Sequence, residues 1–231
     1  MTRACITRPL WLVLPWLFIA AAGFAEDWEL PDDDLEQRIS RVNTGELRLL
    51  PDPPEAPVHQ HHNEINITAG SLEHGWVGLR QCHNNLDPVP ATEIVFRPER
   101  TRGLRILSNR NIGAVRVEGA SVQLKDIRKG AELCLELESR ALTALPGRGW
   151  SLRNGPYMRR FLDGYYPMRV KIRIRYPADL LEAGEFSPRS QPGLTVRRRP
   201  GDIEVDSWFE GRLNTRLDFC RRGSPGCRWV E

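Results

Sequence analysis

Hydrophobic and polar residues alternate with a period of two along most of the chain after residue 58. In residues 131–138, Leu133, Leu135 and Leu137 alternate with acidic residues and Cys134. Such alternation predicts β-strands with one buried face. The same pattern marks seven further segments, carried by Ile65 and Ile67, Val77 and Leu79, Val115 and Val117, Val122 and Leu124, Val170, Ile172 and Ile174, Ile203 and Val205, and Leu213, Leu217 and Phe219.

Turn residues separate these segments at short and regular intervals. Asn84-Asn85, Gly119 and Gly130 are examples, and Glu210-Gly211 is expected to form the last hairpin turn. Many short strands with turns between them predict an all-β protein built as an antiparallel β-sandwich. The pattern allows either two packed lobes or one large sandwich.

The N-terminal part of the mature chain has a different pattern. Leu35, Ile39 and Val42 recur at helical spacing, which predicts one short helix near 33–42. We therefore divide the chain into a signal peptide (1–25), a short helix with a Pro-rich connector (26–57), a first β-sandwich lobe (58–140), a connector rich in Gly, Arg and aromatic residues (141–167), and a second β lobe with a C-terminal disulfide loop (168–231).

The first 25 residues have the features of a signal peptide. Arg3 and Arg8 precede an uncharged run at 9–24, and small residues close it before Glu26. The run is short for a membrane-spanning helix, although an uncleaved anchor is the alternative interpretation. We expect a periplasmic or secreted protein with no membrane span after signal cleavage.

The charge balance excludes one class of partner. The sequence has 33 basic and 30 acidic residues, so it lacks the strong positive field of a dedicated nucleic-acid-binding protein. Nucleic acid is therefore not an expected partner.

Four cysteines remain after signal cleavage. An even number in an exported chain is typical of disulfide bonds. Cys220 and Cys227 are separated by a short loop with Gly and Pro, which favours a local bond and leaves Cys82 to pair with Cys134. This assignment leaves no free thiol for catalysis.

All five histidines lie between residues 59 and 83. His59, His61, His62 and His83 are candidate ligands of a transition metal, copper or zinc, because imidazole nitrogen binds both. His59 and His61 would project from the same face of a strand. The alternative is that these are solvated or structural histidines, since their spacing matches no established ligand motif.

The segment 153–168 combines arginines with aromatic residues between two strand-rich regions. This composition is typical of interface hot spots and of pockets for anionic or sugar-like ligands. The alternative is that its aromatic side chains cap one end of the sandwich. The candidate ligand-binding or partner-binding residues are Arg153, Tyr157, Arg159, Arg160, Phe161, Tyr165 and Tyr166.

Two charged stripes are expected to neutralise each other. The polar face of the strand at 169–175 is basic, and that of the strand at 131–138 is acidic. Pairing across neighbouring strands would fix their register. The residues are Arg169, Lys171, Arg173 and Arg175 on one stripe and Glu132, Glu136 and Glu138 on the other.

Motifs of known enzymes are absent from the sequence. There is no G-x-S-x-G, no Gly-rich phosphate loop and no H-E-x-x-H. A periplasmic hydrolase with two distant carboxylates would leave no such signature. We predict an exported, non-catalytic binding or assembly protein of the cell envelope, whose partner is an envelope protein or a small ligand. The alternative is a periplasmic Cu- or Zn-binding protein; otherwise no cofactor is expected.

Overall fold

The computed structural model describes residues 43–224. The expected signal peptide, the expected helix at 33–42 and Cys227 lie outside these residues. No helix within 43–224 is both long and apolar enough to span a membrane. The elements are β1 (Arg48–Leu49), β2 (Gln60–Asn66), α2 (Ser71–His74), β3 (Trp76–Leu86), β4 (Ala91–Val95), η1 (Pro98–Arg100), β5 (Thr101–Glu118), β6 (Ser121–Arg140), β7 (Leu142–Leu145), β8 (Gly149–Tyr157), β9 (Arg159–Phe161), β10 (Gly164–Tyr166), β11 (Met168–Arg175), β12 (Leu181–Ser187), β13 (Leu194–Arg199), β14 (Asp202–Glu210) and β15 (Leu213–Arg221).

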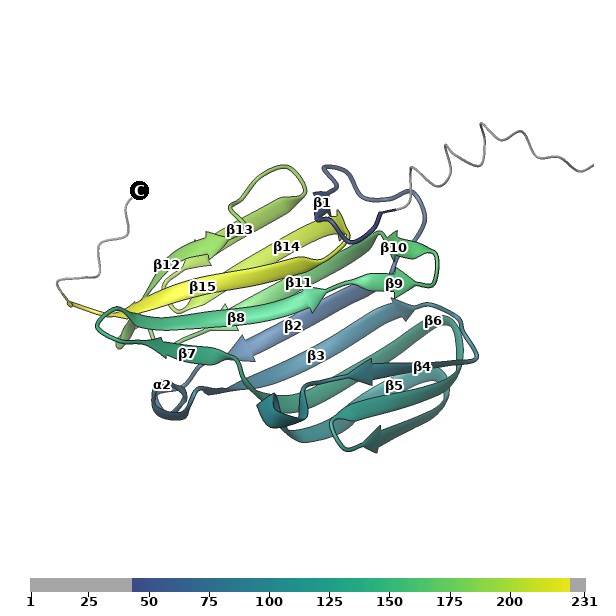
Figure 1. Cartoon of the computed structure of the whole chain (residues 1–231), viewed down its shortest axis with the longest axis horizontal. Helices are drawn as coiled ribbons and strands as arrows, with labels where there is room; N and C mark the ends of the chain where they lie inside the picture. The colour runs from purple at the N-terminus through teal and green to yellow at the C-terminus, as the bar shows by residue number, and fades with distance from the viewer. Residues whose placement is uncertain (1–42, 225–231) are drawn as a thin grey trace, which may run out of the picture. The chain divides into compact units, whose positions relative to one another are not determined.

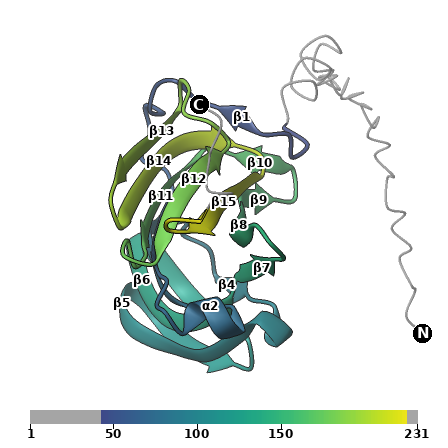
Figure 2. The same cartoon turned by 90° about the vertical axis from the view of Figure 1, so that its left-hand side faces the viewer.

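Most strands form two facing layers, which confirms the predicted all-β sandwich (Figures 1 and 2), and β9 and β10 pair as a separate two-stranded sheet. A nine-stranded sheet has the order β1-β14-β11-β2-β3-β6-β4, with β13 beside β14 and β5 beside β6. A four-stranded sheet, β12-β15-β8-β7, faces the concave side of the large sheet in Figure 2. All strand pairs are antiparallel except β2 and β11.

Strands from both expected lobes share the large sheet, because β11 pairs with β2 as well as with β14. The expected connector at 141–167 also differs from its description above, since it contains strands β7 to β10. In β8, Ser151 and Leu152 are buried in succession, and the pairing with β15 shifts register between Asn154 and Tyr157. This irregularity removes the alternation by which the sequence would have revealed a strand.

Two apolar cores lie against the concave face of the large sheet. The larger core fills the space between the two sheets and includes Phe186, Phe209 and Phe219. The smaller core includes Val122, Leu133 and Leu135 and is covered by residues of β4 and β5. The long strand β6 contributes to both cores, because Leu137 belongs to the larger one.

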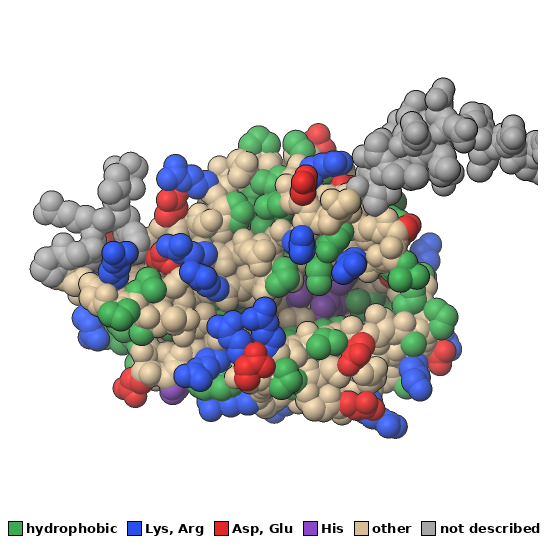
Figure 3. Space-filling view, in the orientation of Figure 1, with side chains coloured by type: hydrophobic (Ala, Val, Ile, Leu, Met, Phe, Trp, Pro, Cys, Tyr) green, Lys and Arg blue, Asp and Glu red, His purple; other side chains and the backbone are tan. Residues whose placement is uncertain are grey.

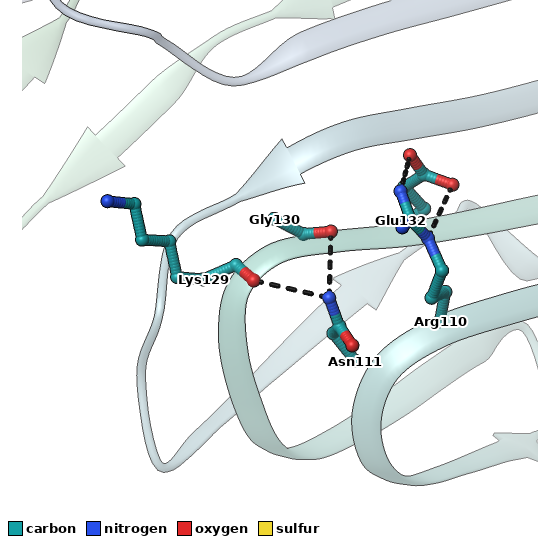
Figure 4. Close-up of polar contacts among 5 residues, drawn as sticks. All are labelled: Arg110, Asn111, Lys129, Gly130 and Glu132. Atoms are coloured by element: carbon teal, nitrogen blue, oxygen red, sulfur yellow. Dashed lines mark hydrogen bonds and ion pairs between the residues drawn. The ribbon is translucent and has the colours of Figure 1, made fainter.

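The hairpin of β5 and β6 contains a bulge that a side-chain amide holds in place (Figure 4). Arg110 pairs with Glu132, but Ile112 pairs with Ile127, so β6 carries extra residues between these two positions. Asn111 has a positive φ of 58° and donates hydrogen bonds to the carbonyl oxygens of Lys129 and Gly130, both at 3.3 Å. Asn tolerates this conformation better than most residues do.

The outer face of the large sheet carries a row of alternating charges across seven strands. Each member is aligned with its neighbour in the strand pairing, in the order Arg197, Glu204, Arg173, Glu64, Arg80, Glu136 and Arg105. A shift of one strand by one residue would break the alternation, so the row favours a single register.

The two charged stripes do not pair with each other, contrary to the prediction. Arg169 donates two hydrogen bonds to Asp206 at 2.9 and 2.7 Å, and Arg173 donates two to Asp202 at 3.0 and 2.8 Å. The acidic stripe on β6 pairs instead with arginines of β5. The prediction failed because β14 and β5, which carry the true partners, adjoin β11 and β6 respectively.

The expected hairpin turn at Glu210-Gly211 is a crossover between the two sheets. It connects β14 of the large sheet to β15 of the small one. Gly211 has a φ of 85°, and a Cβ atom there would lie 1.8 Å from the carbonyl oxygen of Glu46. Only glycine fits this close approach of two backbone segments.

The predicted bond between Cys82 and Cys134 is present. It joins β3 and β6, which are neighbours in the large sheet, at aligned positions on the outer face. Cys220 is buried in β15. Since Cys227 lies outside the described residues, the second bond stays a prediction.

Candidate functional site

Both candidate clusters from the sequence line the same cleft. The cleft has a volume of about 950 Å³ and is bounded by β2 and β3 on one side and by β4, β8 and β9 on the other. Figure 3 shows histidine side chains inside this hollow, with basic side chains beside it. The histidines come from residues 59–83, and Arg153, Tyr157, Arg159, Arg160 and Phe161 come from the aromatic segment.

The floor of the cleft is a polar patch on a face that is otherwise apolar. His59, His61 and Asn63 precede or lie on β2, and Gln81 and His83 lie on β3; we call these five residues the polar floor. His61 is aligned with His83, and Asn63 with Gln81. The alternation places Ile65 and Leu79 next on the same face, within the larger core. The polar floor therefore occupies part of a sheet face whose other inward-facing side chains are apolar.

A chain of hydrogen bonds connects three side chains of the polar floor. Gln81 Nε2 lies 2.8 Å from His83 Nε2, and His83 Nδ1 lies 3.0 Å from His59 Nε2. An amide nitrogen only donates, so His83 Nε2 accepts, and the proton of the neutral His83 ring is on Nδ1. His83 then donates to His59. This chain fixes the tautomer of His83.

The three imidazole rings are nearly parallel: those of His61 and His83 are stacked, and those of His59 and His83 meet edge to edge through their hydrogen bond. The ring centroids of His61 and His83 are 4.4 Å apart and those of His59 and His83 are 5.2 Å apart, with interplanar angles of 25° and 22°. Nitrogen lone pairs lie in the plane of each ring, so the stacked rings of His61 and His83 do not direct theirs toward one point. Among the described residues, no group of three or more His, Cys, Asp or Glu side chains is arranged to hold a metal ion.

Two buried polar atoms of the polar floor have no hydrogen-bond partner. Asn63 is fully buried, and its Nδ2 donates to the Tyr157 hydroxyl at 2.7 Å, but its Oδ1 has no donor. His61 is 9% exposed, and its Nε2 also forms no hydrogen bond of normal geometry, although weaker contacts with Gln81 and Asn63 partly offset the lowering of the ring's pKa by burial. Buried polar atoms without partners cost stability and are rare in folded proteins. Both residues line the cleft, where a bound molecule could complete these hydrogen bonds.

Burial keeps the imidazoles neutral. It lowers the pKa of His59 to about 4 and that of His61 to about 3, and it holds the pKa of His83 well below its usual value. Asp87 opposes this effect at His59, but Arg159 adds to it. Burial also raises the pKa of Tyr157. At neutral pH the polar floor is therefore rich in hydrogen-bonding groups and carries no charge.

Arg159 has a structural role at the edge of the cleft. Its Nε donates to Asp87 at 2.9 Å, its Nη2 donates to the other oxygen of the same carboxylate, and its Nη1 donates to the carbonyl oxygen of Pro167 at 3.2 Å. These bonds connect β9 to the loop after β3. The guanidinium is thus engaged within the protein.

The other candidate residues fall into two groups. Arg153 and Phe161 line the cleft, as does Arg160, whose guanidinium lies over the ring of Tyr165. Tyr165 and Tyr166 belong to β10 and do not line the cleft; Tyr166 packs edge to face against Phe161.

His62 lies apart from the other histidines. It alternates with His61 and is aligned with Cys82, so it is on the outer face of the large sheet and is exposed. The structure thus brings together three of the four histidines proposed as metal ligands.

The sequence alone did not single out Gln81 as part of a site, nor the cleft residues Arg97, Arg100 and Arg140. A signal for the polar floor is visible in the alternation. The positions that share a face change from polar (59, 61, 63) to apolar (65, 67) within one strand-rich segment. For the three arginines we find no local signal.

Comparison with known proteins assigns no family. No family model and no curated protein match the chain. Among solved structures, a variant of an M1 zinc metallopeptidase from Deinococcus radiodurans with a bound Tyr-Ser-Ala substrate has 11% identity and a TM-score of 0.38, over 80% of this chain and 50% of that one. A two-domain M1 zinc metallopeptidase variant with bound L-tryptophan gives 11% and 0.38, over 82% and 51%. The chain spans about half the length of these structures, and the likeness is too distant to support a function.

Proposed function

We propose that this protein is a non-catalytic binding protein of the cell envelope and that its ligand occupies the cleft between the two sheets. The observation that carries the proposal is the pair of buried atoms without partners, His61 Nε2 and Asn63 Oδ1, on the floor of that cleft. A ligand that hydrogen-bonds to both atoms would remove the cost of leaving them unpaired.

The export part of the proposal rests on the signal-like N-terminus and the disulfide. A bond between Cys82 and Cys134 fits an oxidising compartment such as the periplasm or the extracellular space. The non-catalytic part rests on the absence of a known catalytic motif from the sequence.

The test is a thermal-shift measurement with fractionated small molecules and peptides from the native compartment. We compare the wild type with His61→Phe, which keeps a planar ring in the stack but removes Nε2, and with Arg148→Gln, an exposed change outside the cleft. At least one fraction should stabilise the wild type and Arg148→Gln but not His61→Phe. Equal shifts in all three proteins, or no shift with any fraction, would contradict the proposal.

A transition-metal site is the second candidate, since His59 Nε2 and His83 Nδ1 lie 3.0 Å apart and an ion bound between them would replace the proton of their hydrogen bond. Two nitrogen ligands of one ion at 2.0–2.1 Å would lie roughly 3 Å apart. His61 could join only if its ring turned out of the stack. Cu²⁺ or Zn²⁺ should then raise the melting temperature of the wild type but not of His59→Ala, and equal responses would count against the metal.

A further inference from the structure

The cleft has two chemically different ends. Gln81 and Arg140 both line it, and Arg140 is aligned with Trp76, five residues from Gln81 along β3. At about 3.4 Å per residue the cleft therefore runs roughly 17 Å beside β3. This length fits a short stretch of extended polypeptide.

One end of the cleft is basic. Arg97, Arg100, Arg140 and Arg153 line it, all are exposed, and none forms an ion pair with a described residue. The strand pairing brings them together, because Thr101 is aligned with Ser139 and the Arg153 amide donates to the Ala141 carbonyl at 3.1 Å. The carboxylates that line the cleft are Glu93 and Asp87, and Asp87 is engaged by Arg159. The unpaired charge at this end is thus positive.

The other end is apolar at its mouth. Met158 and Phe161 line the cleft and are 43% and 36% exposed. In the sequence they lie on either side of Arg159, which binds Asp87 beside His59. Exposed apolar side chains at a cleft mouth favour an occupant with apolar groups of its own.

The polar floor lies between the two ends. It favours a ligand with hydrogen-bonding groups in its central part. Asn63 Oδ1 needs a donor, and His61 Nε2 donates when its proton is on that nitrogen. A peptide group supplies both an N–H and a C=O. An acyl chain supplies neither and would leave the polar floor without partners and without water.

We propose that the cleft binds an extended acidic peptide segment of a partner protein, with a backbone amide on the polar floor, carboxylates at the arginine end and apolar side chains at the Phe161 end. This inference rests on the proposed function and specifies its ligand. The positive charge of the arginine end favours acidic groups of the ligand. The two buried atoms of the polar floor that lack partners favour an amide of the ligand.

The experiment starts from a phage-displayed library of random decapeptides, panned on the mature protein with its disulfide intact. The enriched peptides should carry Asp or Glu toward one end and apolar residues toward the other. One of them is then synthesised with a fluorescent label, and its affinity is measured by anisotropy at several salt concentrations. No enrichment, or enrichment of peptides without acidic residues, would overturn the proposal.

Matched variants locate the binding. Arg100→Gln combined with Arg153→Gln should weaken the peptide roughly threefold to thirtyfold and flatten the salt dependence, because exposed ion pairs are modest and screened. Arg148→Gln, also exposed but outside the cleft, should bind like the wild type. If the double variant binds like Arg148→Gln, the arginine end does not hold the acidic residues and the proposal is wrong.

A second pair of variants tests the polar floor. Asn63→Leu should weaken the peptide about tenfold. Tyr157→Phe removes the same Asn63–Tyr157 hydrogen bond but keeps Oδ1 free, so it should retain most of the affinity. Equal losses in the two variants would mean that the hydrogen bond, and not Oδ1, matters, which would overturn the amide assignment.

The outcomes also separate this inference from the proposed function. If a compartment fraction stabilises the wild type but not His61→Phe while no peptide is enriched, the cleft binds a ligand of another class and only the peptide assignment fails. If peptides bind equally to the wild type and to all cleft variants, both proposals fail.

Discussion

The buried imidazoles should make the stability of the protein depend on pH between about 6.5 and 5. An unfolded histidine has a pKa of about 6.5, whereas burial lowers the pKa of His59 to about 4 and of His61 to about 3 in the folded state. Between these values the unfolded chain binds more protons than the folded one. Stability is therefore full above pH 6.5 and falls as the pH drops below it.

The size of the stability loss follows from the gap between the pKa of each histidine in the unfolded and in the folded state. Each pH unit below the unfolded pKa costs about 1.4 kcal/mol per ring while the folded ring stays neutral. From about pH 7.5 to about pH 5, His59 and His61 should each remove about 2 kcal/mol from the free energy of unfolding. His83, whose pKa is also lowered, adds a loss in the same direction.

Urea unfolding at these two pH values tests the reasoning. The wild type should lose at least about 4 kcal/mol between them, and His61→Phe should lose about 2 kcal/mol less than the wild type. His74→Gln, which changes an exposed histidine of α2, controls for the removal of an imidazole. If His61→Phe loses as much stability as the wild type does, the His61 ring is not held neutral by burial and the reasoning is refuted.

Three further changes should lower the free energy of unfolding in urea. Cys82→Ser should cost about 3–4 kcal/mol, because the disulfide closes a loop between residues 52 apart. Arg159→Leu should cost about 1–3 kcal/mol, because it leaves the Asp87 carboxylate, 25% exposed, without its partner. Gly211→Ala should cost about 3 kcal/mol or more, because its Cβ would overlap the Glu46 carbonyl oxygen at a φ of 85°.

Each of these changes has its own control. Reductant should destabilise the wild type more than Cys82→Ser, in which only the predicted bond between Cys220 and Cys227 is left to reduce. Adding Asp87→Asn to Arg159→Leu should recover part of the loss, since it removes the unpaired charge. Gly147→Ala adds a Cβ in open space at a φ of 69° and should cost about 1 kcal/mol or less. An equal cost at Gly147 and Gly211 would show that the close approach to Glu46 contributes nothing.

The strand alternation was sufficient for the fold class because each sheet has one buried face. Leu133, Leu135 and Leu137 are all buried, as the pattern requires. The alternation failed where backbone irregularities interrupt it, as in β8, and it could not identify which strands become neighbours. Neighbours such as β2 and β11 are about one hundred residues apart in the sequence, and no local signal specifies such a pairing.

The candidate site was predicted in part for the same reason. Alternation correctly placed His59 and His61 on one face, and that face also holds Asn63. It could not show that the segment at 153–161 lies across from them, since that contact depends on how the two sheets face each other. Nor could it show that Arg159 would be engaged by Asp87 rather than left for a ligand.

The alternating row of charges on the outer face weakens the electrostatic field that an approaching molecule meets on that side of the protein. Neighbouring strands are about 4.8 Å apart, so opposite charges repeat at a spacing shorter than the Debye length of about 8 Å in physiological salt. Their fields largely cancel within a few ångströms of that surface. Among the described residues that line the cleft, arginines outnumber carboxylates, and Arg97, Arg100, Arg140 and Arg153 form no ion pair. An approaching anionic molecule is therefore attracted more strongly to the cleft side, so that electrostatic steering orients the encounter before any contact is made.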